Sequence, residues 1–215
     1  MPAKFFRIPL LSLLLLCALL LPGCQRDEAL TEEEIASIEA IFHRENSRAF
    51  TCMLLSSEYA APQEIDLGWL FREGVPYGDD WGYSVSEEEL AALRPIIGEE
   101  RYQFFLDADS YKTPRHVMDE LLRQYLGMGL EETDQVGLDS LPYLPEYDAY
   151  YGAAYDTQMV IPDITSGVRR DDGTLELRYS PVWYETDDAT HVMVLRPTED
   201  GYLFVSNLPL IPILK

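Results

Sequence analysis

Basic residues are scarce in this chain. Its 215 residues include 16 lysines and arginines against 38 aspartates and glutamates, which gives a formal net charge of −22. Nucleic-acid phosphates are bound through clusters of lysine and arginine, so this balance argues against a nucleic-acid partner. It also argues against electrostatic adsorption to anionic lipid headgroups, which attract basic segments. We interpret the acidity as a feature that keeps a surface-exposed protein body in solution.

The common sequence motifs of hydrolases and zinc proteins are also missing. The chain has no Gly-x-Ser-x-Gly segment and no Ser-x-x-Lys pair, the patterns that place a nucleophilic serine beside its base. It has no His-x-x-x-His or Cys-x-x-Cys pair, which are usual spacings of zinc ligands. His43, His116 and His191 stand alone, and we expect them at surface, capping or core positions. We therefore predict no catalytic residue, no metal and no other cofactor.

Calcium is the metal that the sequence excludes least. The segment Asp107-Ala108-Asp109-Ser110 begins like a calcium-binding loop. Tyr111 and Lys112 then follow, where further oxygen ligands and a turn glycine are expected. Because acids are so frequent in this chain, short acidic fragments of this kind also arise by chance.

The one long hydrophobic run is too short to cross a membrane. It extends from Ile8 to Leu21, after Lys4 and Arg7. These 14 residues would form a helix of about 21 Å at ~1.5 Å per residue, whereas a spanning helix needs about 20 residues to cross ~30 Å of hydrocarbon. The run therefore has the length of a signal-peptide core. Pro22 and Gly23 then interrupt the helix and open the backbone to a peptidase.

The residues Leu21-Pro22-Gly23-Cys24 resemble the lipobox of bacterial lipoprotein precursors, in which an aliphatic, a variable and a small residue precede a cysteine. The resemblance covers residues 1–24, with Pro22 in place of the usual alanine or serine. It implies that residues 1–23 are a lipoprotein signal peptide and that Cys24 carries a diacylglycerol. The protein would then be lipid-anchored to the cell membrane and face outside the cytoplasm, because two or more acyl chains bind a bilayer stably. The alternative is an ordinary secretory signal with a chance cysteine.

Cysteine is rare, and lipidation would leave a single thiol. Cys17 is removed with the signal peptide and Cys24 is modified. No second free cysteine then remains for Cys52, and we expect no intramolecular disulfide. We interpret Cys52 as a small buried residue within an apolar segment. A nucleophilic Cys52 is the alternative.

Helix patterns precede strand patterns in the rest of the chain. We expect residues 24–30 to form a short tether and residues 31–215 to form a single α+β globular domain. The predicted helices begin at recognisable caps, which are Thr31 with Glu34, Pro62, Ser86 with Glu89, and Thr113 with Pro114. In the helix that follows Pro62, we expect Ile65 and Trp69 to face the core.

Two Asp-Gly turns indicate β-hairpins in the C-terminal part. Asp171-Asp172-Gly173 separates the apolar runs 164–168 and 175–179, and Glu199-Asp200-Gly201 separates 192–195 and 202–205. Glycine accepts the positive φ of such turns, and apolar residues alternate with polar ones in the run 175–179. We therefore predict an α+β fold in which a helical N-terminal half packs on a C-terminal antiparallel β-meander.

The globular part also resembles uncharacterised lipoproteins of Gram-positive gut bacteria. The resemblance spans much of residues 50–209 and is carried by four segments, Glu64-Ile65-Asp66-Leu67, Tyr125-Leu126-Gly127, Tyr150-Tyr151 and Val205-Ser206-Asn207-Leu208-Pro209. It implies no activity, substrate or site.

Tyrosines and carboxylates interleave between residues 143 and 156, and a loop near residue 80 adds further rings. Sugar-binding sites use such pairs, since rings stack on the apolar face of a sugar while acids bind its hydroxyl groups. We predict a ligand-binding surface made of Tyr77, Trp81, Tyr147, Asp148, Tyr150, Tyr151 and Asp156. The alternative is that these tyrosines are structural, because tyrosine is favoured in strands.

Three hypotheses for function follow. The first is a non-enzymatic, membrane-tethered domain outside the cytoplasm that binds an envelope glycan or a protein partner. The second is a carboxylate-based hydrolase of envelope glycans, with acids from 146–156 or 79–80 paired at about 5–5.5 Å or 6.5–9.5 Å in one aromatic cleft. The third is an envelope assembly or scaffold protein, which predicts a large exposed apolar patch.

Overall fold

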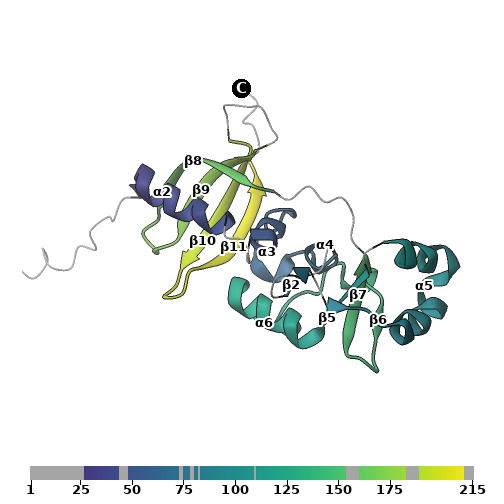
Figure 1. The fold of residues 1–215 in the computed structure, drawn as a ribbon. Helices are drawn as coiled ribbons and strands as arrows, with labels where there is room; N and C mark the ends of the chain where they lie inside the picture. Colours follow the sequence, from purple (N-terminus) through teal and green to yellow (C-terminus); the bar gives the residue numbers. More distant parts are fainter. Residues whose placement is uncertain are drawn as a thin grey trace, which may run out of the picture.

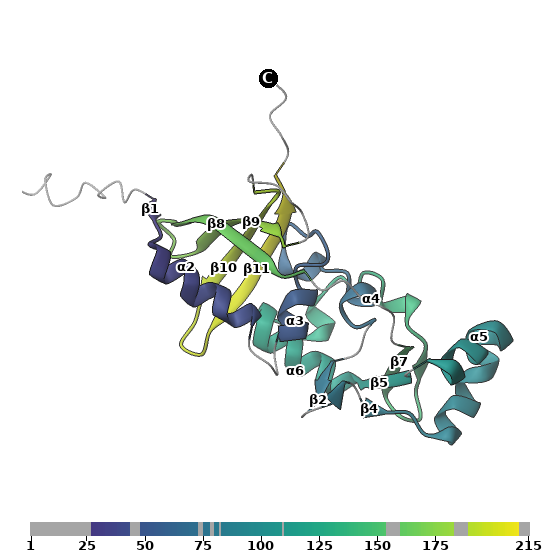
Figure 2. The same ribbon diagram turned by 45° about the horizontal axis from the view of Figure 1, so that its top comes forward.

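The computed structural model of the chain describes residues 27–43, 48–72, 75–77, 80–81, 83–108, 110–153, 160–182 and 189–210. Its elements form an elongated molecule (Figure 1). One end holds a five-stranded sheet with helix α2 (Glu32–Glu39), and the other end holds helix α5 (Glu87–Asp107). Helices α3 (Arg48–Met53), α4 (Leu67–Leu70) and α6 (Arg115–Leu126) lie between these ends, as a second view also shows (Figure 2).

The five-stranded sheet is antiparallel throughout, with the order β1-β8-β9-β10-β11. Its strands are β1 (Glu28–Ala29), β8 (Pro162–Arg169), β9 (Leu175–Pro181), β10 (His191–Pro197) and β11 (Tyr202–Pro209). The turn between β8 and β9 holds Gly173 at a φ of 82°, a left-handed conformation that costs glycine no strain. Both predicted hairpins are confirmed. Because β1 pairs with β8, the residues that we expected to be a tether reach the sheet at Glu28.

One face of this sheet forms the main core. Leu175, Leu177 and Tyr179 of β9 are buried, and so are Met193 and Leu195 of β10. Their alternation follows from the two-residue period of a strand, which points every second side chain to the same face. Glu176 and Arg178, which alternate with the buried residues of β9, face the other way.

Helix α2 and the 3-10 turn η1 (Ala40–Phe42) cover this sheet. Ile38 is buried, and the ring of Phe42 meets the ring of Phe204 edge to face with centroids 6.1 Å apart. The Glu39 carboxylate accepts a hydrogen bond of 3.0 Å from the backbone N–H of Ile164, at a position of β8 that β1 does not reach. This contact protects part of a sheet edge that would otherwise be open to pairing.

The central helices continue the same core. Met118, Leu122 and Leu126 form the buried face of α6, at the spacing of a helix with one apolar side. The helix ends at Gly127, whose φ is 73°. Cys52 of α3 is buried, as predicted, and its thiol contacts the carbonyl oxygen of Phe42 at 3.9 Å.

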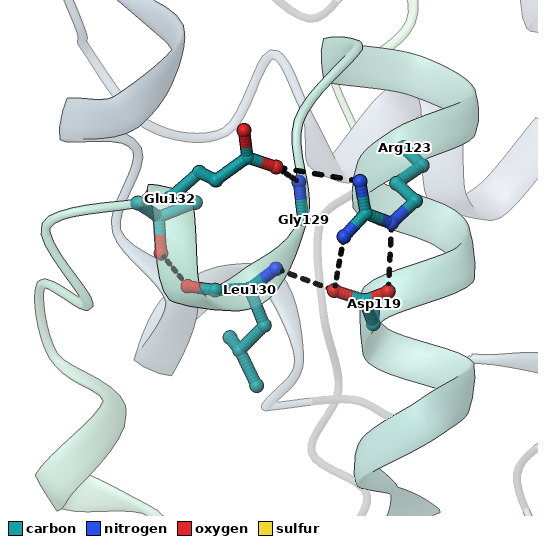
Figure 3. A network of polar contacts seen from close by, with 6 residues as sticks. Asp119, Arg123, Gly129, Leu130 and Glu132 are labelled. Carbon is teal, nitrogen blue, oxygen red and sulfur yellow. Dashed lines mark hydrogen bonds and ion pairs between the residues drawn. The ribbon is translucent and has the colours of Figure 1, made fainter.

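A group of polar contacts holds the chain where it leaves α6 and enters the 3-10 turn η3 (Leu130–Glu132) (Figure 3). Asp119 accepts hydrogen bonds of 2.8 Å from Arg123 Nε and from the Leu130 N–H. Glu132 accepts one of 2.7 Å from the Gly129 N–H. The hydrogen bonds of Arg123 and then Leu130 lower the pKa of Asp119. A side chain at Gly129 would collide with the Arg123 guanidinium and the Asp119 carboxylate, so another residue there would push these two side chains out of their present contact.

A second antiparallel sheet has the order β4-β5-β7-β6 and lies beside α5. Its strands are β4 (Tyr83–Ser84), β5 (Ser110–Pro114), β6 (Tyr143–Leu144) and β7 (Ala149–Ala153), and β2 (Pro76–Tyr77) pairs separately with β3 (Asp80–Trp81). Two further 3-10 turns are η2 (Pro62–Glu64) and η4 (Leu138–Ser140). A core separate from the main one is formed by Leu93, Phe105, Leu144, Ala149, Tyr151 and Ala153.

The predicted fold class is therefore wrong. The N-terminal half is not a helical layer, since strands β1 to β5 all begin before residue 115. The segment α5, which consists of two helices joined by a kink at Gly98 (φ 77°), packs on β6 and β7 of the second sheet and not on the meander. The helix start expected at Thr113 and Pro114 is displaced as well, because both residues belong to β5 and α6 begins at Arg115.

Candidate functional site

The predicted tyrosine and acid segment forms the turn between β6 and β7. The Tyr143 hydroxyl donates a hydrogen bond of 2.6 Å to Asp148, and this bond raises the pKa of Tyr143. The rings of Tyr143 and Tyr150 pack with centroids 4.7 Å apart. Asp148 has a φ of 44°, and its carbonyl oxygen accepts from the backbone N–H of Arg115 at the start of α6. Asp148 and Tyr150 are thus held by the turn itself.

Tyr151 points to the opposite side and is buried against Glu89. Its hydroxyl donates to Glu89 Oε1 at 2.8 Å, and Lys112 Nζ donates to the same oxygen at 2.7 Å. Glu89 also caps α5 by accepting from the Ser86 N–H at 2.8 Å. The fourth predicted residue, Tyr147, is exposed on the turn, and Lys112 Nζ lies 5.9 Å from its ring centroid.

The desolvated Glu89 carboxyl is stabilised in its charged form. Burial is the largest influence and by itself raises the pKa of Glu89. The hydrogen bonds from Lys112, Ser86 and Tyr151 together outweigh burial, so the pKa lies below its ordinary value. The side chain of Glu89 keeps 2% of its surface exposed and that of Lys112 keeps 25%. We interpret Glu89, Lys112 and Tyr151 together as a buried anchor that joins α5, β5 and β7.

The remaining predicted residues are not brought to that anchor by the described structure. Tyr77 lies on β2 and Trp81 on β3, where they pair with Asp80 and Pro76 respectively. Cys24 and Asp156 lie outside the described residues. The six described residues of the predicted surface therefore occupy the β6–β7 hairpin, the interior beneath it and the β2–β3 ladder.

A groove of about 770 Å³ lies between α4 and α5, with the turn η4 along one side and the end of β7 along its base. Aromatic rings, arginines and glycine backbone share its lining. The lining residues are Asp66, Gly68, Trp69, Arg72, Ile97, Glu100, Arg101, Phe104, Phe105, Gly137, Ser140, Leu141, Gly152 and Ala153. Volumes of this size are typical of ligand sites.

One wall consists of Trp69 on α4 and Arg72, which follows the end of that helix. Asp66 caps this helix by accepting from the Trp69 N–H at 2.9 Å, and this bond fixes where the indole leaves the backbone. The guanidinium carbon of Arg72 lies 5.1 Å from the centroid of the indole ring, within cation–π range. Trp69 nevertheless keeps 41% of its surface exposed. Our prediction that Trp69 faces the core is wrong, whereas Ile65 is buried.

Helix α5 supplies the opposite wall through Arg101. Its guanidinium carbon lies 5.9 Å from the centroid of the Phe105 ring, and its Nη2 donates to the carbonyl oxygen of Ser140 at 3.2 Å. The second contact links α5 to η4 and fixes the position of the guanidinium. Arg101 belongs to none of the seven ion pairs found among the described residues.

The side of the groove between α4 and η4 depends on two glycines in close contact. A side chain at Gly68 would collide with the carbonyl oxygen of Gly137, and one at Gly137 would collide with the Asp66 carboxylate. Gly137 also has a φ of 70°, which disfavours any other residue. The lining here is therefore bare backbone. Neither the glycines nor Arg101 had a signal in the sequence that marked them as groove residues.

Among the described residues, no group of three or more His, Cys, Asp or Glu side chains is arranged to hold a metal ion. No helix among the described residues has the length and apolar character that crossing a bilayer requires. Comparisons with protein-family models, with curated proteins and with solved structures find no match for this chain.

Proposed function

We propose that this protein is a lipid-anchored domain outside the cytoplasm that binds a ligand in the groove between α4 and α5. The lipid on Cys24 supplies the membrane attachment and the groove supplies recognition. Envelope glycans are the ligands that we place first, because the anchor would hold the domain among them.

The composition of the groove carries this proposal. Trp69 is a large aromatic side chain that stays substantially exposed, and it shares the groove lining with Arg72 and Arg101 in a chain with a large excess of acids. An exposed aromatic ring beside fixed polar groups is typical of a recognition surface. Both side chains also have neighbours that support them, because the Trp69 ring lies against the Arg72 guanidinium and Arg101 donates to the carbonyl oxygen of Ser140. Such support reduces the entropy that binding has to overcome.

The position of the groove fits a membrane-attached protein. Strand β1 begins four residues after Cys24, and Figure 2 places it at the end of the molecule opposite to α5. A lipid on Cys24 would bring the five-stranded sheet near the bilayer. The groove beside α5 would then face away from the membrane, where soluble or wall-bound ligands are accessible.

The hydrolase hypothesis receives less support from the described residues. A glycosidase needs a carboxyl group that stays protonated near neutral pH, which requires a raised pKa. Within the described part of the chain, each carboxyl group with a shifted pKa has it lowered, namely Glu34, Glu89, Glu99, Asp119 and Asp172. Asp148, from the segment that we considered for catalysis, is engaged by Tyr143. We therefore propose binding and not hydrolysis.

The scaffold hypothesis predicts one large exposed apolar patch. Besides Trp69, Val136, Tyr147 and Val182, the large apolar side chains exposed among the described residues are Ile96 and Leu106 on α5 and Leu208 on β11. These two elements lie in different parts of the molecule (Figure 1). This separation does not favour a single apolar docking surface, so we do not propose the scaffold function.

Trp69→Ala is expected to lower glycan retention by the full-length protein about tenfold, which corresponds to ~1.4 kcal/mol. The reason is loss of the aromatic surface in the groove. The measurement uses full-length protein extracted in detergent and immobilised, and it compares the sugar retained from a soluble digest of cell envelopes. Tyr102→Ala is the matched control. Tyr102 is an aromatic residue of α5 that does not line the groove, and its ring centroid lies 5.0 Å from the guanidinium carbon of Arg94. Equal retention by wild type and Trp69→Ala would contradict the proposal.

A further inference from the structure

Arg101 differs from most of the other basic side chains by its environment. Arg94, Arg115, Arg123, Arg169 and Arg170 each have a carboxylate partner, as has Lys112. Arg101 instead rests against a ring and donates to a backbone carbonyl oxygen. Its positive charge is therefore not neutralised by any of the ion pairs of the described residues, although the chain has more than two acids for each base.

This environment leaves Arg101 ready for an external anion. A guanidinium has five N–H donors in a planar fork, and the bond to Ser140 uses one of them. Contact with Phe105 and Ser140 places the guanidinium of this exposed side chain at the groove. A carboxylate is the partner that this fork engages with two parallel hydrogen bonds. An incoming carboxylate would not have to displace an internal one.

The surroundings of Arg101 select the rest of the ligand. Phe104 on α5 is half-buried and Trp69 on α4 is exposed, and both offer ring surface to a flat apolar face, which sugar rings have. Glu100, which is exposed at the groove, can accept hydrogen bonds from hydroxyl groups. A run of many carboxylates would be repelled by a chain of net charge −22. The fitting ligand therefore carries isolated carboxylates between neutral sugars.

We propose that the groove binds an oligosaccharide containing carboxylate-bearing sugars, with Arg101 pairing the carboxylate and Trp69 stacking on the neighbouring ring. This inference rests on the proposed function and names the class of its ligand. Arg101 is then the residue that decides specificity between acidic and neutral glycans.

The test compares each acidic oligosaccharide with its own neutral form. The probes are short oligosaccharides in which glucuronate or muramate alternates with N-acetylglucosamine, together with the same molecules after chemical reduction of the carboxyl groups to alcohols. Binding to the full-length protein in detergent is followed by calorimetry. Wild type is expected to bind at least one acidic probe at least tenfold more tightly than its reduced form. Arg101→Met is expected to remove this difference, and Arg101→Lys to restore only part of it.

Controls separate the two proposals. Arg94 lies in α5 before the kink at Gly98 and outside the groove, and Arg94→Met is expected to bind like wild type. If Arg101→Met retains the preference for acidic probes, or if acidic and reduced probes bind equally, the carboxylate assignment is overturned while a loss in Trp69→Ala still supports the groove. Binding of free peptide carboxylates in preference to every sugar would also overturn it. If no probe binds, the sugar assignment falls, and the envelope-digest experiment decides separately on the groove.

Discussion

Glu89→Ala is expected to lower the free energy of unfolding by about 3 kcal/mol, near the lower end of the range for broken buried ion pairs. The variant would leave the Lys112 ammonium and the Tyr151 hydroxyl without their shared acceptor. It would also remove one half of the capping box at Ser86. The lower end applies because Lys112 keeps a quarter of its side-chain surface in solvent. Chemical denaturation of wild type and variant measures the difference.

Glu99→Ala is the matched control, at an exposed pair within α5 beyond the kink at Gly98. Its pair with Arg94 is more than half exposed on both sides, and exposed pairs contribute at most about 1 kcal/mol. A Glu89→Ala effect no larger than that of Glu99→Ala would contradict the buried anchor.

Glu89→Gln adds a pH test, because the pKa of Glu89 is lowered from its ordinary 4.5 in the folded chain. The stability that the charge adds is complete above that value and is lost as pH falls through the lower folded pKa. The gap between wild type and Glu89→Gln should therefore shrink on acidification.

Asn207→Leu is expected to cost about 3 kcal/mol or more, at ~1–3 kcal/mol for each buried polar group left without a partner. Asn207 is 1% exposed and accepts from the Tyr179 hydroxyl at 2.8 Å. Its amide donates to the carbonyl oxygens of Leu55 at 3.1 Å and Ser57 at 2.9 Å. This single side chain therefore joins the meander to the segment after α3. Leucine has a similar volume but would leave all three groups unsatisfied.

Tyr179→Phe separates the parts of this effect. It removes only the hydroxyl, so its cost should be smaller than that of Asn207→Leu. In the double variant the two losses should not add, because the pair shares one hydrogen bond. Equilibrium unfolding in urea provides all three values. Additive losses, or an Asn207→Leu effect below about 1 kcal/mol, would show that Asn207 does not hold these segments together.

The parts of the fold that could be predicted are those fixed by local chemistry. The hairpins at Gly173 and Gly201 follow from Asp-Gly turns between alternating runs. The helix starts at Thr31 and Ser86 follow from capping boxes, because both partners lie within three residues. In each case the interaction that determines the structure is close in sequence, so its pattern is visible without the fold.

The second sheet could not be predicted because its determinants are distant. β5 pairs with β7 in a register that sets Tyr111 opposite Gly152, about 40 residues away. A side chain at Gly152 would collide with the Tyr111 ring, so this strand pairing depends on a contact that neither segment reveals alone. β4 and β6 have two residues each and are too short for any period to appear. The predicted helical layer was wrong for this reason.

The candidate site shows the same limit. Residue types suggested the tyrosines between 143 and 151, but the structure commits Tyr151 to Glu89 and Asp148 to Tyr143. The groove was missed because its two walls, Trp69 and Arg101, lie on separate helices. Trp69 was assigned to the core because a helical period identifies a face without showing what covers it. At Trp69 that face is not covered by other residues but lines an open groove.

The state of Cys24 tests the central claim most directly, because the proposed function requires a lipid there. Full-length protein should sediment with membranes, and mass spectrometry should find a mature chain that begins at Cys24 and carries diacylglycerol. The Cys24→Ala variant should move to the soluble or secreted fraction. An unmodified amino terminus downstream of residue 24, or a Cys24→Ala variant that still sediments with membranes, would contradict the account.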